Sequence, residues 1–222
     1  RQANVFRLGS PEVSLAQQAR RELLTGFMDR YPRVQLDTSI LNLRILWDQL
    51  LAGELDAVLS YKVVVNDRRP PPLPGCDEVP LLQTIGRVCV PRESPLARLN
   101  MLRPSNLAGQ AMVISPGKDC PNVIEGLESA LTRMGVSITM APETHRATLE
   151  HMARTRRMLC FSWCEPGVPP SPPPEDMVML PLENDPFVLE LSILTQRATR
   201  SAMTRRFVEM ARDVAARHVS VP

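Results

Sequence analysis

The chain has few of the residues on which catalysis or metal binding depends. Its 222 residues include only three histidines and five cysteines, and none of these shows the paired spacing typical of a zinc site. No Ser–His–Asp order, glycine-rich phosphate loop or pair of catalytic carboxylates is recognisable. The sequence therefore predicts a protein that is not an enzyme and that needs no metal and no cofactor.

Long apolar runs are also absent. No stretch approaches the roughly 20 apolar residues of a membrane-spanning helix, and the opening RQANVFRLGS lacks the apolar core of a signal peptide. A formal net charge of +2 provides no electrostatic reason for direct binding of nucleic acid. We therefore expect a cytoplasmic protein that contacts no membrane and that does not bind DNA through this part of the chain.

What the chain does contain is an alternation of strand-like and helix-like segments. An apolar strand at 4–10 precedes a helix that we expect to begin at Ser10, and a strand at 34–40 precedes a helix capped by Asn42. The continuous apolar run at 55–61 is typical of a strand that is buried on both faces of a parallel sheet.

The same alternation returns in the second half of the chain. A long strand at 78–91, which we expect to be antiparallel to its neighbours, follows a proline-rich loop at 68–75. Strands and helices then alternate between 111 and 163, and a second proline-rich stretch at 166–176 precedes the last strands and the last helix. The prolines exclude regular helix and central strand from both stretches.

Two alternating units imply an α/β fold with two Rossmann-like lobes joined by two crossing strands. We expect one lobe to comprise residues 1–80 and 187–222 and the other to comprise residues 81–186. Ligands of open α/β sheets bind at the carboxyl ends of the strands, where helix N-termini expose unsatisfied N–H groups. The cleft between the lobes is therefore the expected ligand site.

Several segments resemble a known family. The runs FMDRYPRVQLD, LLAGELDAVLSY, PLLQTIGRVCVPRESPLA and NLAGQAMVISPG are similar to those of the effector-binding domain of bacterial LysR-type transcriptional regulators. The resemblance implies a type-2 periplasmic-binding-protein-like fold that senses a small-molecule effector. It also implies that DNA is bound only through an N-terminal winged helix-turn-helix domain, which this chain does not contain, and that the regulator is a homodimer or homotetramer.

The chain departs from the family pattern at two places. The turn that is commonly rich in glycine reads ARTRRMLCFSW, with Thr155, Arg156 and Arg157 at the glycine positions, and Asn42-Leu43 stands where a small Ser or Thr is common. The resemblance therefore does not extend to the identity of the effector.

The residues that we expect to bind the effector lie at predicted strand ends and helix starts. Helix N-termini favour anions, and a largely apolar cleft with a few polar groups suits a small organic molecule, so we expect a small organic anion. Plain helix capping remains an alternative role for Ser10 and Asn42, and core packing remains one for Trp163. The expected effector-binding residues are Ser10, Asn42, Leu43, Tyr61, Lys62, Ser115, Lys118, Ser162 and Trp163.

Three further points stay open at this stage. A stand-alone solute-binding protein for a transporter is the alternative to a regulator. The resemblance implies a dimer in which helix 14–30 of one chain runs antiparallel to helix 121–135 of the other, with Ala16, Leu24 and Met28 available to a partner. Cys160 and Cys164 are either buried free thiols, which we favour, or a redox pair.

Overall fold

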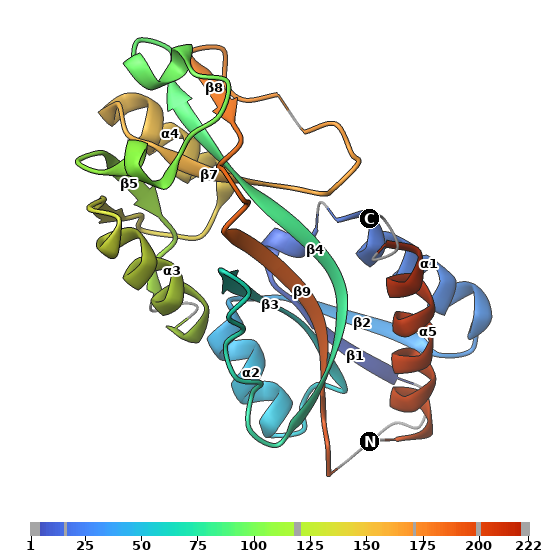
Figure 1. The fold of residues 1–222 in the computed structure, drawn as a ribbon. Coiled ribbons are helices and arrows are strands. Elements are labelled where there is room, and N and C mark those ends of the chain that lie inside the picture. The colour runs from blue at the N-terminus through green and yellow to red at the C-terminus, as the bar shows by residue number, and fades with distance from the viewer. Residues whose placement is uncertain (1–4, 16, 118–120, 171, 199–200, 219–222) are drawn as a thin grey trace. The chain divides into compact units, whose positions relative to one another are not determined.

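The chain groups into two compact units in the computed structural model, which describes residues 5–15, 17–117, 121–170, 172–198 and 201–218 (Figure 1). Both units are built of alternating strands and helices. Unit 1 comprises Arg1–Tyr61, Pro71–Leu82 and Glu190–Pro222, and unit 2 comprises Lys62–Pro70 and Gln83–Leu189.

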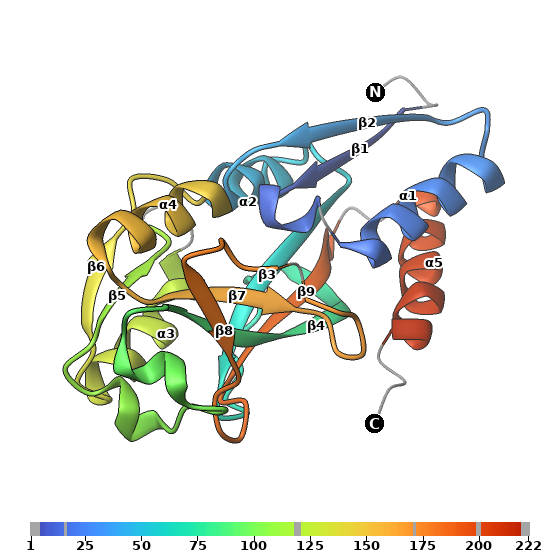
Figure 2. The ribbon, with the colours of Figure 1, turned by 90° about the horizontal axis from the view of Figure 1, so that it is seen from above.

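Unit 1 is an α/β layer built around the first strand. Strand β1 is paired in parallel with β2 on one side and β3 on the other, and β9 lies next to β3. Helix α2 covers one face of these strands, and α1 and α5 lie side by side on the other (Figures 1 and 2). The elements are β1 (Val5–Ser10), α1 (Gln18–Arg30), β2 (Gln35–Ile40), α2 (Leu43–Leu51), β3 (Ala57–Val65), β9 (Phe187–Gln196) and α5 (Ala202–His218).

Aromatic packing holds the α1–α5 face of unit 1 to the sheet. The ring centroids of Phe6 and Phe27 are 5.1 Å apart, and the Phe207 ring lies 4.7 Å from Phe6 and 5.3 Å from Phe27. All three side chains are buried, one each from β1, α1 and α5. Aromatic pairs at these distances add stabilisation beyond the area that they bury. The four-residue spacing of apolar residues in α1 is what brings Phe27 to this face.

The first helix begins later than the sequence predicts. A single 3-10 turn, η1 (Glu12–Ser14), follows β1, and α1 starts at Gln18 without a side-chain cap. Pro11 has extended backbone angles, and the Ser14 hydroxyl donates to the Pro11 carbonyl at 2.7 Å, which closes the turn on itself. The expectation that Ser10 opens this helix is therefore wrong.

Unit 2 contains a second strand–helix alternation. Strands β5 and β6 pair in parallel, and a parallel bridge between Met112 and Leu159 places the approach to β7 beside β5. Helices α3 and α4 lie on either side of β5 (Figures 1 and 2). The elements are β5 (Ala111–Ile114), α3 (Pro121–Arg133), β6 (Ser137–Met140), α4 (Arg146–Arg156), β7 (Cys160–Cys164) and β8 (Met177–Leu180), with the 3-10 turns η2 (Pro95–Arg98) and η3 (Pro104–Leu107).

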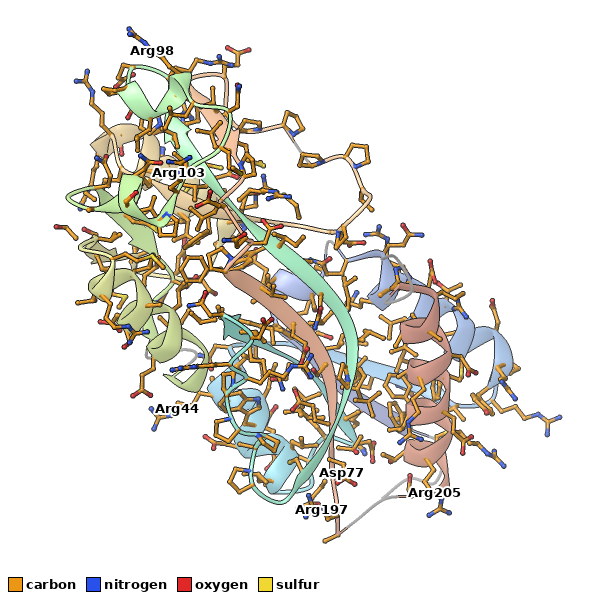
Figure 3. The ribbon with its side chains drawn as sticks, viewed as in Figure 1. Arg44, Asp77, Arg98, Arg103, Arg197 and Arg205 are labelled. Atoms are coloured by element: carbon orange, nitrogen blue, oxygen red, sulfur yellow. The ribbon has the colours of Figure 1, made fainter. Side chains whose placement is uncertain are left out.

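Strands β3, β4 (Cys76–Pro91) and β9 each continue from one unit into the other. Strand β4 begins in unit 1 and ends in unit 2, and β9 returns from unit 2 to unit 1. In unit 2, β4 is antiparallel to both β7 and β8, as expected. In unit 1, Arg197 Nε donates to Asp77 Oδ1 at 3.0 Å and ties the start of β4 to the end of β9 (Figure 3).

Candidate functional site

Two of the predicted site residues meet at the carboxyl edge of the unit 1 sheet. Ser10 and Ile40 are register partners at the ends of β1 and β2, and the Leu41 N–H donates to the Ser10 carbonyl at 3.3 Å. Asn42 follows directly and begins α2. The edge at which ligands of open α/β sheets bind therefore carries Ser10 and the first turn of α2.

The Ser10 hydroxyl at this edge is buried and lacks a hydrogen-bond partner in the described part of the chain. An unsatisfied buried hydroxyl costs about 1–3 kcal/mol, so it needs an explanation. Gln49 Oε1 and Ser192 Oγ have the same property but lie inside α2 and β9 rather than at a strand end.

Asn42 and Leu43 have structural roles that the sequence left open. The Asn42 Oδ1 accepts the Ile45 N–H at 3.0 Å, which confirms the predicted helix cap. Leu43 is fully buried in the core. Its side chain is apolar and packs in the core, so the polar group that this residue could present is its backbone N–H in the first turn of α2.

Tyr61 and Lys62 do not end their strand, contrary to expectation. Strand β3 continues through three valines to Val65, and the turn follows at Asn66 and Asp67, both of which have positive φ. The β-branched valines favour extended backbone, which explains the extra length. Tyr61 is nearly buried and Lys62 is partly exposed, and the boundary between the two units falls between them.

Ser115 follows β5 in unit 2, at the carboxyl end of that strand, and is partly exposed. Lys118, which we also expected to bind the effector, lies outside the described residues.

Ser162 and Trp163 are neighbours on β7 and therefore face opposite sides of the sheet. Ser162 is buried on the same face as Cys160 and Cys164. The Trp163 ring stacks on Phe161 with centroids 5.4 Å apart. Trp163 also packs over its register partner Gly86, where an added Cβ would lie 3.1 Å from Trp163 Cζ3. One face of β7 therefore cannot present both residues to a ligand.

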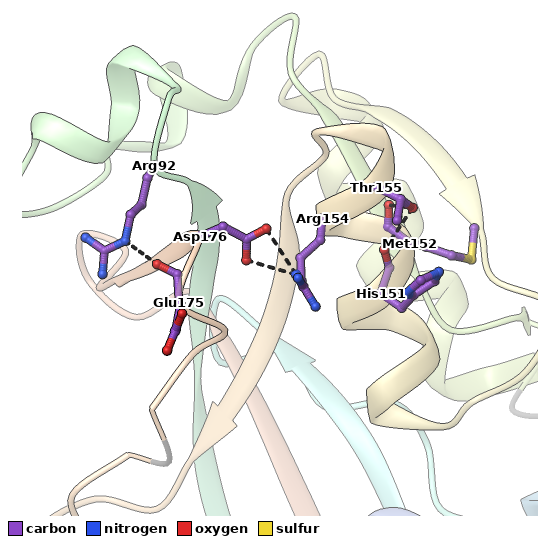
Figure 4. Close-up of polar contacts among 7 residues, drawn as sticks. All are labelled: Arg92, His151, Met152, Arg154, Thr155, Glu175 and Asp176. Atoms are coloured by element: carbon purple, nitrogen blue, oxygen red, sulfur yellow. Dashed lines mark hydrogen bonds and ion pairs between the residues drawn. The ribbon is translucent and has the colours of Figure 1, made fainter.

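Most basic side chains of unit 2 are engaged in polar contacts with the chain itself. Arg154 Nε donates to both carboxylate oxygens of Asp176 at 2.9 and 3.1 Å, and Arg92 Nε donates to the Glu175 carbonyl (Figure 4). Arg87 forms an ion pair with Asp185 at 2.7 Å. The contacts of Arg92 and Arg154 attach the end of the second proline-rich stretch to β4 and α4.

A comparison of the sequence with models of known protein families gives a match over nearly the whole chain. The model of the LysR substrate binding domain matches residues 1–216. The chain belongs to this family. No curated protein matches it significantly in sequence.

Solved structures of LysR-type effector-binding domains have the same fold. The C-terminal domain of a probable LysR family regulator from Rhodococcus sp. RHA1 is 22% identical with a TM-score of 0.71, and covers 94% of this chain and 98% of its own. The BenM effector-binding domain with its effector benzoate is 13% identical, with a TM-score of 0.74 and coverages of 98% and 95%. The regulatory domain of Synechocystis PCC6803 CcmR in complex with 2-PG is 15% identical, with a TM-score of 0.71 and coverages of 95% and 97%. The α/β, type-2 periplasmic-binding-protein-like fold expected from the sequence is thereby confirmed.

One hydrogen bond of this LysR substrate-binding domain was not predicted from the sequence. The Trp47 Nε1–H donates to Ser60 Oγ at 3.2 Å, and this bond joins α2 to β3. The sequence signal for it was a serine within an otherwise apolar strand.

Among the described residues no group of three or more histidine, cysteine or acidic side chains is placed to hold a metal ion. The described helices include none with the length and apolar character needed to cross a bilayer.

Proposed function

We propose that the chain is the ligand-sensing domain of a LysR-type transcriptional regulator. The observation that carries this proposal is the family match over residues 1–216. An effector that binds one arrangement of the two units better than another shifts the regulator between states. In this proposal one lobe comprises residues 1–80 with 187–222 and the other comprises residues 81–186. In this proposal DNA is bound through a separate N-terminal domain, and the regulator acts in the cytoplasm.

The effector in this proposal is a small organic anion. Its first contact is Ser10, because the buried Oγ lacks a partner among the described residues and lies at the carboxyl edge of β1. The first turn of α2, at Asn42 and Leu43, adds backbone N–H groups and a partial positive charge. The ligands named for two structures of the same fold, benzoate and 2-PG, support this ligand class.

The remaining expected contacts belong to the same proposal. Lys62 or Lys118 supplies positive charge, Ser115 and Ser162 supply hydroxyls, and Tyr61 or Trp163 supplies apolar surface. Of the two β7 residues, only one contributes its side chain to a given face, since Ser162 and Trp163 point to opposite sides.

A thermal-shift screen of carboxylates and aromatic metabolites tests the proposal. A compound at 100 times its Kd stabilises the fold by about 2.7 kcal/mol. We expect Ser10→Ala to abolish the shift produced by such a hit. Ser192→Ala is the matched control, because it removes a buried hydroxyl that also lacks a described partner but lies within β9. Loss of the shift in both variants, or in neither, would contradict the role of Ser10.

The alternative function is that of a solute-binding protein for a transporter. Membership of the LysR substrate-binding domain family favours the regulator. The gene that encodes the chain separates the two, since a preceding helix-turn-helix domain supports a regulator and a signal peptide supports a transporter component. We propose no catalytic activity, because the similar solved structures are regulatory domains.

We also propose that the regulator forms a homodimer or homotetramer through antiparallel contact of α1 with α3 of a partner. Met28 on α1 is 48% exposed and Leu24 is partly exposed, so both can cover a partner, whereas Ala16 lies outside the described residues. Sedimentation of Met28→Glu at high micromolar concentration should show a monomer. Met101→Glu is the control, because Met101 is similarly exposed but lies outside both helices. A dimer that persists in Met28→Glu would exclude this interface.

A further inference from the structure

Sulfur-bearing side chains gather in the core of unit 2. Most of them belong to one packed cluster that includes Val113, Ala141 and Ala153 and is bordered by Leu149 of α4. Strands β4, β7 and β8 and helix α4 contribute to it. The sulfur-bearing residues are Cys89, Met152, Met158, Cys160, Met177 and Met179 of this cluster, together with Cys164 beside Met179.

Two of the cysteines face each other directly. Cys89 on β4 and Cys160 on β7 are register partners in an antiparallel pair, and each is 1% exposed. Residues directly opposite in such a pair have Cβ atoms about 4.5–5.5 Å apart. Their thiols share a hydrogen bond that lowers the pKa of Cys89 and raises the pKa of Cys160. A single ion between the strands would therefore be within reach of both sulfur atoms.

Thioether and thiol groups continue from this pair toward the surface. Met179 on β8 is the register partner of Cys89, and its Sδ lies 3.7 Å from the Sγ of Cys164. Cys164 is partly exposed at the end of β7. Sulfur atoms, which are soft metal ligands, thus extend from the partly exposed Cys164 through Met179 to the buried Cys89–Cys160 pair. A disulfide between Cys89 and Cys160 would make no use of the methionine sulfur atoms.

The donor set selects the kind of ion. Zinc needs four nitrogen, sulfur or oxygen ligands, and no group of three or more histidine, cysteine or acidic residues is placed to supply them in the described part of the chain. Thiolate and thioether ligands favour monovalent copper. We propose that Cys89 and Cys160 bind one Cu(I) ion as two thiolate ligands within this sulfur cluster.

The binding step is a ligand exchange without oxidation. Two S–H bonds break, two Cu–S bonds form, two protons leave to solvent and the copper stays monovalent, so the buried complex carries one negative charge. Two charged groups act on these thiols in opposite senses: Glu150 opposes the thiolates and Arg146 favours them. These two residues also form an ion pair with each other at 2.6 Å.

Competition titration under anaerobic, reducing conditions tests the site. The purified chain is titrated with Cu(I) in the presence of bathocuproine disulfonate, whose copper complex is coloured. We expect the chain to withdraw one equivalent of copper from the competitor. Loss of a supporting group near a metal already lowers affinity by about 10–100-fold, so we expect Cys89→Ala and Cys160→Ala each to lower it by about 100-fold or more.

Matched variants separate this pair from the other cysteines. Cys76→Ser removes a buried thiol of unit 1, and Cys120→Ser removes a cysteine outside the described residues; both should retain the affinity of the unaltered chain. Failure of the unaltered chain to compete, or full affinity in Cys89→Ala or Cys160→Ala, would overturn the proposal. X-ray absorption of the copper-loaded unaltered chain needs no variant. Two sulfur ligands support the site, and nitrogen or oxygen ligands overturn it.

Discussion

Replacement of Gly9 by alanine should weaken both the fold and the candidate effector site. Gly9 lies on β1 directly before Ser10, where α2 crosses the strand. An added Cβ would lie 2.5 Å from Leu46 Cδ2, 2.8 Å from Leu55 Cδ1 and 3.3 Å from Val58 Cγ2. Contacts below 3.0 Å cannot persist, so the two leucine side chains, of which Leu46 belongs to α2, must shift.

The stability that Gly9→Ala should lose follows from how closely these side chains are packed. Both leucines are buried with almost no exposed surface, and an extra carbon in a close-packed core costs about 1–3 kcal/mol. A chain of this size loses about 2–4 °C of Tm per kcal/mol, so Gly9→Ala should melt roughly 2–12 °C below the unaltered protein. Asn42 caps α2 and belongs to the candidate effector site, so the thermal shift produced by an effector should also decrease.

Two variants decide whether the clash is the cause. Gly126→Ala is the control, because Gly126 lies in α3 with nothing near an added Cβ, and it should stabilise the chain by about 0.5–1 kcal/mol. Leu46→Ala should cost less stability in the Gly9→Ala background than alone, because it removes the atom that clashes. A Gly9→Ala variant that melts with the unaltered protein, or that shows additive effects with Leu46→Ala, would refute the reasoning.

Three further predictions concern single positions. Asn42→Ala should cost about 0.5–2 kcal/mol by removing the cap of α2, and Asn42→Asp should retain most of that stability in chemical denaturation; equal losses in the two variants would contradict the capping role. Gly86→Ala should cost about 1–3 kcal/mol, because an added Cβ would lie 3.1 Å from Trp163 Cζ3 and 3.3 Å from a backbone oxygen, and a change in tryptophan fluorescence should accompany it. The pKa of Glu22 in the folded chain is lowered by its hydrogen bond from Gln18 and by the nearby His218 and Arg217. The ionised Glu22 therefore stabilises the fold above about pH 4.5, and this stabilisation is lost as the pH falls through the lower pKa of the folded state. Glu22→Gln should make Tm less dependent on pH in that acidic range, and an unchanged pH dependence would contradict the role of Glu22.

The sequence predicted the elements whose signals are local. The Asn42 cap and the buried β3 run were both recognisable, because a cap and an apolar run each depend on a few adjacent residues. The start of α1 was not predicted correctly. A Ser-Pro pair is a valid helix signal, but the Ser14 hydroxyl bonds back to Pro11 and ends the first turn after three residues.

The arrangement of the candidate sites depends on contacts between distant segments, which a single sequence does not contain. Ser10 was predicted to bind the effector because it was expected to open a helix, yet it stands out because its hydroxyl is buried at a strand end without a described partner. Ser162 and Trp163 were expected to act together, although their adjacency on one strand separates them to opposite faces. Cys89 was not considered with Cys160 because only the β4–β7 register places them side by side.

The same register explains why β7 can serve two unrelated purposes. On one face, Trp163 packs over Gly86 and stacks on Phe161, whose ring centroid is 5.2 Å from that of Phe187. On the other face, Cys160 and Cys164 point toward the sulfur cluster. Because the side-chain period of a strand is two, a shift of one residue in the pairing would exchange these faces and bury the aromatic rings among the methionines. The small residue at Gly86, opposite the largest ring of the strand, makes that shift costly and so fixes Cys160 opposite Cys89.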